Sequence, residues 1–144
     1  MVDRAILFEA KAFLCWDKFP QLAIQLIPVA DAVAFFYPPA QTALTIHVFY
    51  EPDLTDFSRP LFLLFHEAGH LVQWLEMAAA GRDQEFKQQM ELDKGEPKVQ
   101  FERDAWQNGE SLLSEFVAKK HLNHYDLQQG YKEFAKICLS SYKL

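Results

Sequence analysis

One motif in the sequence has residue types and spacing that suit metal chemistry, His66-Glu67-Ala68-Gly69-His70. In an α-helix, His at i and i+4 project from one face, about 40° apart around the axis and about 6 Å apart along it. Their imidazoles can bind one tetrahedral metal ion, and Glu67 can reach a metal-bound water without being a ligand. A zinc ion acidifies such a water, and the carboxylate accepts its proton. The motif therefore predicts His66 and His70 as zinc ligands and Glu67 as a general base.

The apolar surroundings of the motif favour this interpretation. The residues before it, 61–65, and those after it, 71–72, are apolar, and burying two His and a Glu without a partner is costly. The competing interpretation is a pair of hydrogen-bonded core histidines. Gly69 has two interpretations of its own: a close packing point between helices, or the small residue that lets another segment approach the site.

A catalytic zinc site needs a third protein ligand and leaves one position for water. On a helical wheel of residues 99–121, Glu102 lies in the middle of an apolar stripe, whereas Asp104 lies on the polar side. Glu110 lies at the edge of the stripe, about 12 Å further along the axis. A carboxylate on a buried face needs a partner, so Glu102 is predicted as the third ligand. The competing interpretation is that Glu102 is a surface residue near a frayed helix start. The acidic candidates considered are Asp93, Glu96, Glu102, Asp104, Glu110 and Glu115.

The elements that must position these residues follow from hydrophobic periodicity. Residues 32–37 and 43–50 are expected to form a hairpin with a long loop, and the apolar segment 22–28 suits either a strand or a helix. The helix carrying the motif is expected to be central and buried, because it is apolar on most faces. This order predicts a single α+β domain over residues 1–144. Helices are expected over residues 3–19, 61–80, 82–92, 99–121 and 126–142.

Composition narrows the class of protein. The chain has 144 residues, of which 50% are hydrophobic and 24% charged, and this balance is typical of one globular domain. A formal net charge of −6 argues against a general nucleic-acid binder. The longest apolar run, residues 61–65, is far too short to span a membrane. Cys15 and Cys138 lie in apolar contexts, which favours reduced thiols. A soluble, cytoplasmic protein with neither nucleic-acid nor membrane partners is expected.

The motif, followed by Glu102 on a second helix, resembles the gluzincin branch of zinc metallopeptidases. The second helix resembles the ImmA/IrrE-like metallopeptidases, in which the ligand Glu is followed by small residues at +3 and +7 and a Leu pair at +10 and +11, here Ala105, Gly109, Leu112 and Leu113. The resemblance covers about residues 40–117. It implies a zincin-like fold with a small antiparallel sheet packed on the motif helix, a Zn²⁺ cofactor, and hydrolysis of peptide bonds, in some members those of a transcriptional repressor.

Two features depart from that pattern. Trp106 occupies the +4 position at which many gluzincins have an Asp that holds a ligand His. The chain also lacks the DNA-binding helix-turn-helix segment that ImmA-type chains often carry or neighbour. The expected partner is a peptide or protein substrate, including a regulatory protein. The alternatives are a zincin-like metal-binding domain without peptidase activity, acting as a regulatory or interaction module, and an interaction protein in which the motif is accidental.

Two further expectations concern the surroundings of the site. Residues 43–49 could be the strand edge that pairs with an extended substrate, or an ordinary hairpin strand. His121, His124 and Tyr125 fall in a turn between two helices. One of them could donate a hydrogen bond to the reacting carbonyl oxygen, although a solvated helix end is the simpler interpretation.

Overall fold

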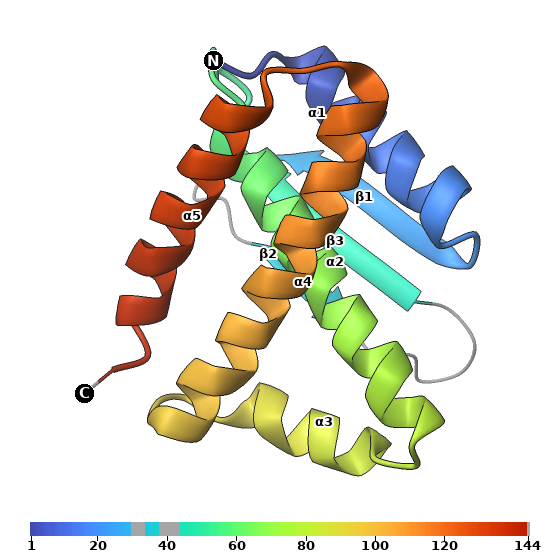
Figure 1. Ribbon diagram of the computed structural model, residues 1–144, viewed down its shortest axis with the longest axis vertical. Helices are drawn as coiled ribbons and strands as arrows, with labels where there is room; N and C mark the ends of the chain where they lie inside the picture. The colour runs from blue at the N-terminus through green and yellow to red at the C-terminus, as the bar shows by residue number, and fades with distance from the viewer. Residues whose placement is uncertain (30–33, 38–43, 144) are drawn as a thin grey trace.

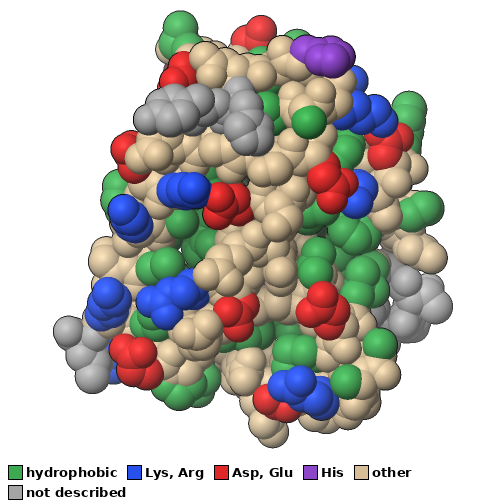
Figure 2. All heavy atoms as spheres, viewed as in Figure 1, with side chains coloured by type: hydrophobic (Ala, Val, Ile, Leu, Met, Phe, Trp, Pro, Cys, Tyr) green, Lys and Arg blue, Asp and Glu red, His purple; other side chains and the backbone are tan. Residues whose placement is uncertain are grey.

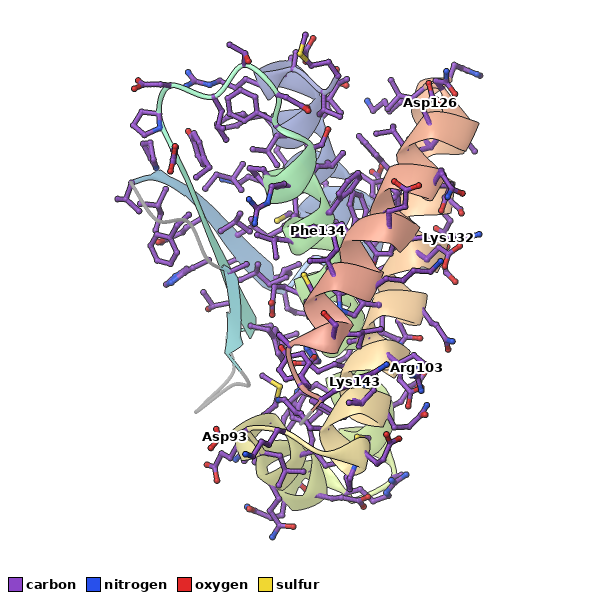
Figure 3. All side chains as sticks on the ribbon, turned by 90° about the vertical axis from the view of Figure 1, so that its left-hand side faces the viewer. Asp93, Arg103, Asp126, Lys132, Phe134 and Lys143 are labelled. Carbon is purple, nitrogen blue, oxygen red and sulfur yellow. The ribbon has the colours of Figure 1, made fainter. Side chains whose placement is uncertain are left out.

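A small sheet, a long central helix and a pair of outer helices form three successive layers (Figures 1 and 3). The sheet contains β1 (Leu22–Pro28), β2 (Ala34–Tyr37) and β3 (Leu44–Tyr50), and it packs on the central helix α2 (Ser58–Ala79). The outer layer contains α4 (Glu96–Lys120), which crosses α2, and α5 (His124–Ser140) beside it. This computed structural model describes all residues except 30–33, 38–43 and 144, and leaves the side chains of residues 35, 37, 124 and 125 undescribed.

The remaining elements are an N-terminal helical segment and a short connecting helix. The N-terminal helix α1 (Arg4–Ala12) continues into a π-helical segment, η1 (Phe13–Lys18), and the two replace the single helix expected over residues 3–19. The short helix α3 (Asp83–Glu91) connects α2 to α4. Helices are thus found close to all five expected ranges. The expectation of an α+β chain is confirmed.

The sheet is mixed, with the strand order β1-β3-β2. β2 pairs antiparallel with β3, as expected for the hairpin, with Ala34 opposite Val48. β1 pairs parallel with β3, with Leu22 opposite Leu44. The expectation of an antiparallel sheet is therefore wrong for β1. Alternating apolar residues show which face of a strand is buried, but they carry no signal for the direction of the neighbouring strand.

Local signals explain where the helices begin and end. The carboxylate of Asp56 accepts hydrogen bonds from the backbone N–H of Ser58 and of Val2, at 3.1 and 3.0 Å. It thereby supports the start of α2 and ties down the N-terminus. Gly81, with φ 74°, follows the end of α2 in a conformation that favours glycine. α4 starts three residues before the expected position, because Pro97 fits its first turn.

The core lies between the sheet and the helices, and the side chains on one face of β3 point into it: Leu44, Ile46, Val48 and Tyr50. None of the helices in the described part of the chain is long and apolar enough to cross a membrane. Acidic and basic side chains are interspersed on the face shown in Figure 2.

Candidate metal centre

The His66–His70 motif lies in the buried middle of α2. His66, Glu67 and His70 have exposed fractions of 6%, 6% and 2%, because the sheet covers one side of α2 and α4 covers the other. The two imidazole centroids are 4.6 Å apart. The prediction that both histidines share one helical face is confirmed.

Small residues let α4 approach this part of α2. A Cβ on Gly69 would overlap the backbone of Ala105 and of Gly109. A Cβ on Gly109 would overlap the carbonyl group of Phe65 and the hydroxyl of Tyr131. Neither glycine can therefore be enlarged without moving a helix. The two interpretations of Gly69 describe the same contact: it is a close packing point, and it lets a second helix reach the site.

Glu102 is the carboxylate that α4 brings to the histidines. Its Oε2 atom lies 2.5 Å from Nε2 of His70 and 3.5 Å from Nε2 of His66. One potential ligand atom from each of the three residues lies within 4.8 Å of the other two. The helical-wheel prediction that Glu102 faces the motif is confirmed in its geometry.

The other acidic candidates lie away from the histidines. Asp104 accepts a hydrogen bond of 2.8 Å from Gln100, and Glu110 lies 3.4 Å from Lys132 of α5. The remaining three are exposed: Asp93, Glu96 and Glu115.

The three side chains fit a divalent metal ion such as zinc. Nε2 of a neutral His70 and Oε2 of Glu102 both carry lone pairs, so their 2.5 Å separation requires a proton between them, and a metal ion would take the place of that proton. Ligands about 2.1 Å from a tetrahedral zinc ion lie about 3.4 Å from one another. The 3.5 Å separation between His66 and Glu102 is close to this spacing, whereas the 2.5 Å separation between His70 and Glu102 would have to widen by about 1 Å for both to bind one ion. Two imidazoles and one carboxylate also form a usual catalytic zinc set that leaves a position for water.

His70 is held in place by a chain of two buried hydrogen bonds. Nε2 of Gln73 donates to the Phe101 carbonyl oxygen at 2.8 Å, which directs Oε1 of Gln73 towards Nδ1 of His70, also at 2.8 Å. Nδ1 must therefore carry a proton, and Nε2 faces Glu102. Gln73 was not among the residues predicted from the sequence. Its position one turn after His70 is the signal that could have identified it.

His66 is held differently, by stacking. Its ring lies on the indole of Trp106, with centroids 4.0 Å apart and an interplanar angle of 19°. Nδ1 of His66 is buried and has no hydrogen-bond partner among the described residues. Trp106, which stands at the +4 position after Glu102, therefore contacts His66 through its ring face and gives it no hydrogen bond.

A buried lysine lies behind the carboxylate. Lys98 is 5% exposed, and its Nζ is 3.4 Å from Oε1 of Glu102, the oxygen that does not face His70. It also donates to the backbone carbonyl oxygens of Met90 and Gln89, at 3.1 and 3.5 Å. Lys98 therefore pairs with Oε1, while Oε2 faces the two histidines. It was not predicted from the sequence, although it lies one turn before Glu102 on the same face.

The charges of the site shift the pKa values of its members. Burial would raise the pKa of Glu102, but hydrogen bonds with His66 and His70 outweigh it and hold the pKa well below its usual range. Burial raises the pKa of Glu67 to about 8, against the attraction of His70 and Lys98. A bound divalent cation would favour the ionised form of Glu67. That form is the one that can accept a proton.

Glu67 and the three candidate ligands open onto a cavity of about 380 Å³. Phe36 of β2 lines it on one side, and Phe134 and Cys138 of α5 line it on the other, followed by Tyr142. Figure 3 shows Phe134 where α5 faces α2. The cavity joins the sheet edge, the metal centre and α5. It is large enough for a few substrate atoms beside the ligands.

For the two open expectations about the surroundings of the site, the structure favours an ordinary hairpin strand over a substrate-binding edge and a solvated helix end over an oxyanion donor at His121. β3 lies between β1 and β2, so residues 44–49 are not a free edge. Within the described residues β2 pairs only with β3, and it is the strand beside the cavity. His121 lies 19 residues after Glu102, about 28 Å along the helix axis, which is too far to reach the reaction centre. The side chains at 124 and 125, and residue 43, lie outside the described part.

Comparison of the chain with protein-family models, with curated proteins and with solved structures finds no match. The residues of this site and their geometry are therefore the basis for inferring a function.

Proposed function

We propose that this protein is a zinc-dependent metallopeptidase with a zincin-like fold. The convergence of His66, His70 and Glu102 from two crossing helices, next to the buried Glu67, carries the proposal. The HExxH helix beneath a small sheet and the third ligand on a later helix also support it. The parallel pairing of β1 is a departure from the antiparallel sheet that the resemblance implies.

The residues of the site have distinct roles in this proposal. His66, His70 and Glu102 bind the metal, and Lys98 neutralises part of the charge of Glu102. A bound zinc ion lowers the pKa of a water ligand and polarises the carbonyl group of the substrate. The Glu67 carboxylate accepts the proton of the attacking water and transfers it to the leaving amine nitrogen.

We expect a peptide or protein substrate to lie extended beside β2. Backbone groups at a strand edge bind an extended chain without regard to its sequence, and side-chain pockets then give specificity. β2 has four residues, so this edge is short. A short edge favours one cognate partner, such as a regulatory protein, over general protein degradation.

The test is metal content together with hydrolysis. The purified protein should bind about one zinc ion per chain and cleave an unstructured protein or its cognate partner. Glu67→Gln should retain zinc but lose activity by about 10²–10⁴-fold, because an amide cannot accept the proton. Glu110→Gln, outside the cavity, is the matched control and should retain activity. Unchanged turnover in zinc-loaded Glu67→Gln would exclude this residue as the base. Stable zinc binding with no cleavage would favour a metal-binding regulatory module.

A further inference from the structure

The metal cavity contains two cationic side chains, and they differ in how fully they are bound. Lys98 has three hydrogens and three acceptors: Glu102 and the carbonyl oxygens of Met90 and Gln89. It has no donor left for a substrate. Arg59, at the other end of the cavity, is exposed and has five N–H donors, and no hydrogen bond or ion pair with another described residue is formed by its guanidinium.

The exposed Arg59 side chain lies over an aromatic ring. Its guanidinium carbon lies 5.3 Å from the ring centroid of Phe134. Phe134 packs against Trp106, with centroids 5.8 Å apart, and Trp106 stacks on the metal-facing His66. A continuous aromatic wall therefore runs from Arg59 to the metal centre. This cation–π contact uses none of the N–H donors of the guanidinium, so they are available for a planar carboxylate.

The charge balance of the cavity favours an anionic ligand. Among the described residues that line it, Glu67 and Glu102 supply the carboxylates, and Arg59 and Lys98 supply the cations. A bound divalent ion adds two positive charges to this balance, so the loaded cavity has a net positive charge. Such a cavity attracts negatively charged groups and disfavours cations.

We infer that Arg59 is a specificity residue that binds a carboxylate of the substrate; this inference rests on the proposed peptidase function. Arg59 and His66 are seven residues apart, so they share one face of α2 and are separated by about 10 Å along its axis. An extended peptide advances about 3.3 Å per residue. The carboxylate bound by Arg59 is therefore two or three residues from the scissile bond. It belongs either to an Asp or Glu side chain or to the C-terminus of the peptide.

Matched peptides test this inference. Quenched fluorescent peptides would carry Glu or Gln at each of three positions on either side of the scissile bond, all with an amidated C-terminus. A second pair would differ only in a free or amidated C-terminus. We expect the zinc-loaded protein to prefer the carboxylate by about tenfold in kcat/KM at one position, two or three residues from the scissile bond. The first set detects an acidic side chain and the second a C-terminal carboxylate.

Substitution of Arg59 identifies the source of the preference. In Arg59→Gln the ratio of kcat/KM between the carboxylate peptide and its neutral match should fall to about one. In Arg59→Glu this ratio should reverse in favour of the neutral peptide. Arg103→Gln, on α4 outside the cavity, should retain the wild-type ratio. A preference that survives in Arg59→Gln would come from the metal ion itself and would overturn the inference, as would the absence of any preference.

Binding gives a readout that does not depend on turnover. The same peptides, titrated by fluorescence polarisation into zinc-loaded Glu67→Gln, should bind about tenfold more tightly with the carboxylate than without it. The double variant that also carries Arg59→Gln should lose this difference. If no peptide is cleaved but the Arg59-dependent binding remains, the proposed function fails and the binding site stands. If the peptides are cleaved but neither cleavage nor binding depends on Arg59, the proposed function stands and the inference about Arg59 fails.

Discussion

The two histidines of the candidate metal centre are held in different ways. His70 is fixed by the hydrogen-bonded chain through Gln73 to the backbone of α4, which sets its tautomer and its direction. His66 is held by the flat surface of Trp106, which fixes the plane of its ring but provides no acceptor for Nδ1. We therefore expect metal affinity to depend more on the surroundings of His70 than on those of His66.

The largest effect should come from Glu102, which faces both histidines. Glu102→Ala should lose most bound zinc, and it should destabilise the metal-free protein by about 3–5 kcal/mol because Lys98 stays buried without its carboxylate. Elemental analysis and urea unfolding measure the two effects. Asp104→Ala and Glu110→Ala are the controls and should retain zinc. If Glu110→Ala empties the site while Glu102→Ala does not, the helical-wheel assignment is wrong.

The sequence predicts the candidate ligands better than the residues that hold them. The convergence of the three candidate ligands could be predicted because a motif with i, i+4 spacing and a lone carboxylate in an apolar stripe are periodic signals. The helical spacing places Gln73 beside His70 and Lys98 beside Glu102, but it does not show what either residue does. Each is a polar residue whose role depends on which backbone carbonyl the other elements bring near it. Trp106 was recognised as a departure, but its stacking depends on the angle at which α4 crosses α2.

In the fold, likewise, some features could be predicted from the sequence and others could not. The helices follow from 3.6-residue periodicity, and the small residues Gly69, Ala105 and Gly109 anticipated the close helix crossing. The parallel pairing of β1 with β3 could not be predicted, because the segment from β1 to β3 passes through β2 at the opposite edge of the sheet. No pattern in the residues of β1 indicates this connection.

On the His70 side, Gln73→Leu should remove the acceptor of the Nδ1 proton. We expect zinc affinity to fall by about 10- to 100-fold, which is the usual effect of losing a residue that orients a ligand. Competition with a chromophoric chelator measures the affinity. Gln107→Leu, at an exposed position on α4, is the control. Equal affinity in the wild type and in Gln73→Leu would mean that packing alone orients His70.

On the His66 side, Trp106→Phe should have a smaller effect, because a phenyl ring can still stack on the imidazole. We expect zinc affinity to change by less than about fivefold. Trp106→Leu removes the stacking and should reduce affinity further, though less than Gln73→Leu does. A larger loss in Trp106→Phe than in Gln73→Leu would reverse the comparison between the two sides.

The smallest effect, the uptake and release of protons, separates the histidines most directly. Burial lowers the pKa of His66 to about 4. Burial also opposes the charge on His70, but the hydrogen bond and the charge of Glu102 outweigh it and raise the pKa above 6.5. In the metal-free protein, the raised pKa of His70 gives stability that is present below pH 6.5 and is lost as pH rises through the folded pKa. The lowered pKa of His66 has the opposite effect on stability, which falls as pH decreases from 6.5 towards about 4.

Zinc must displace the proton that lies between His70 and Glu102, whereas His66 is already neutral at pH 6. Zinc binding at pH 6 should therefore release about one proton per ion, and this number should fall towards zero as pH rises above the pKa of His70. The measurement is calorimetry in buffers of different ionisation enthalpy, in the Glu67→Gln background so that Glu67 contributes no proton. Gln73→Leu should shift the release to lower pH, because the Gln73 hydrogen bond helps to raise the pKa of His70. Release of two protons at pH 6 would mean that His66 is also charged, and that its stacking on Trp106 does not keep it neutral.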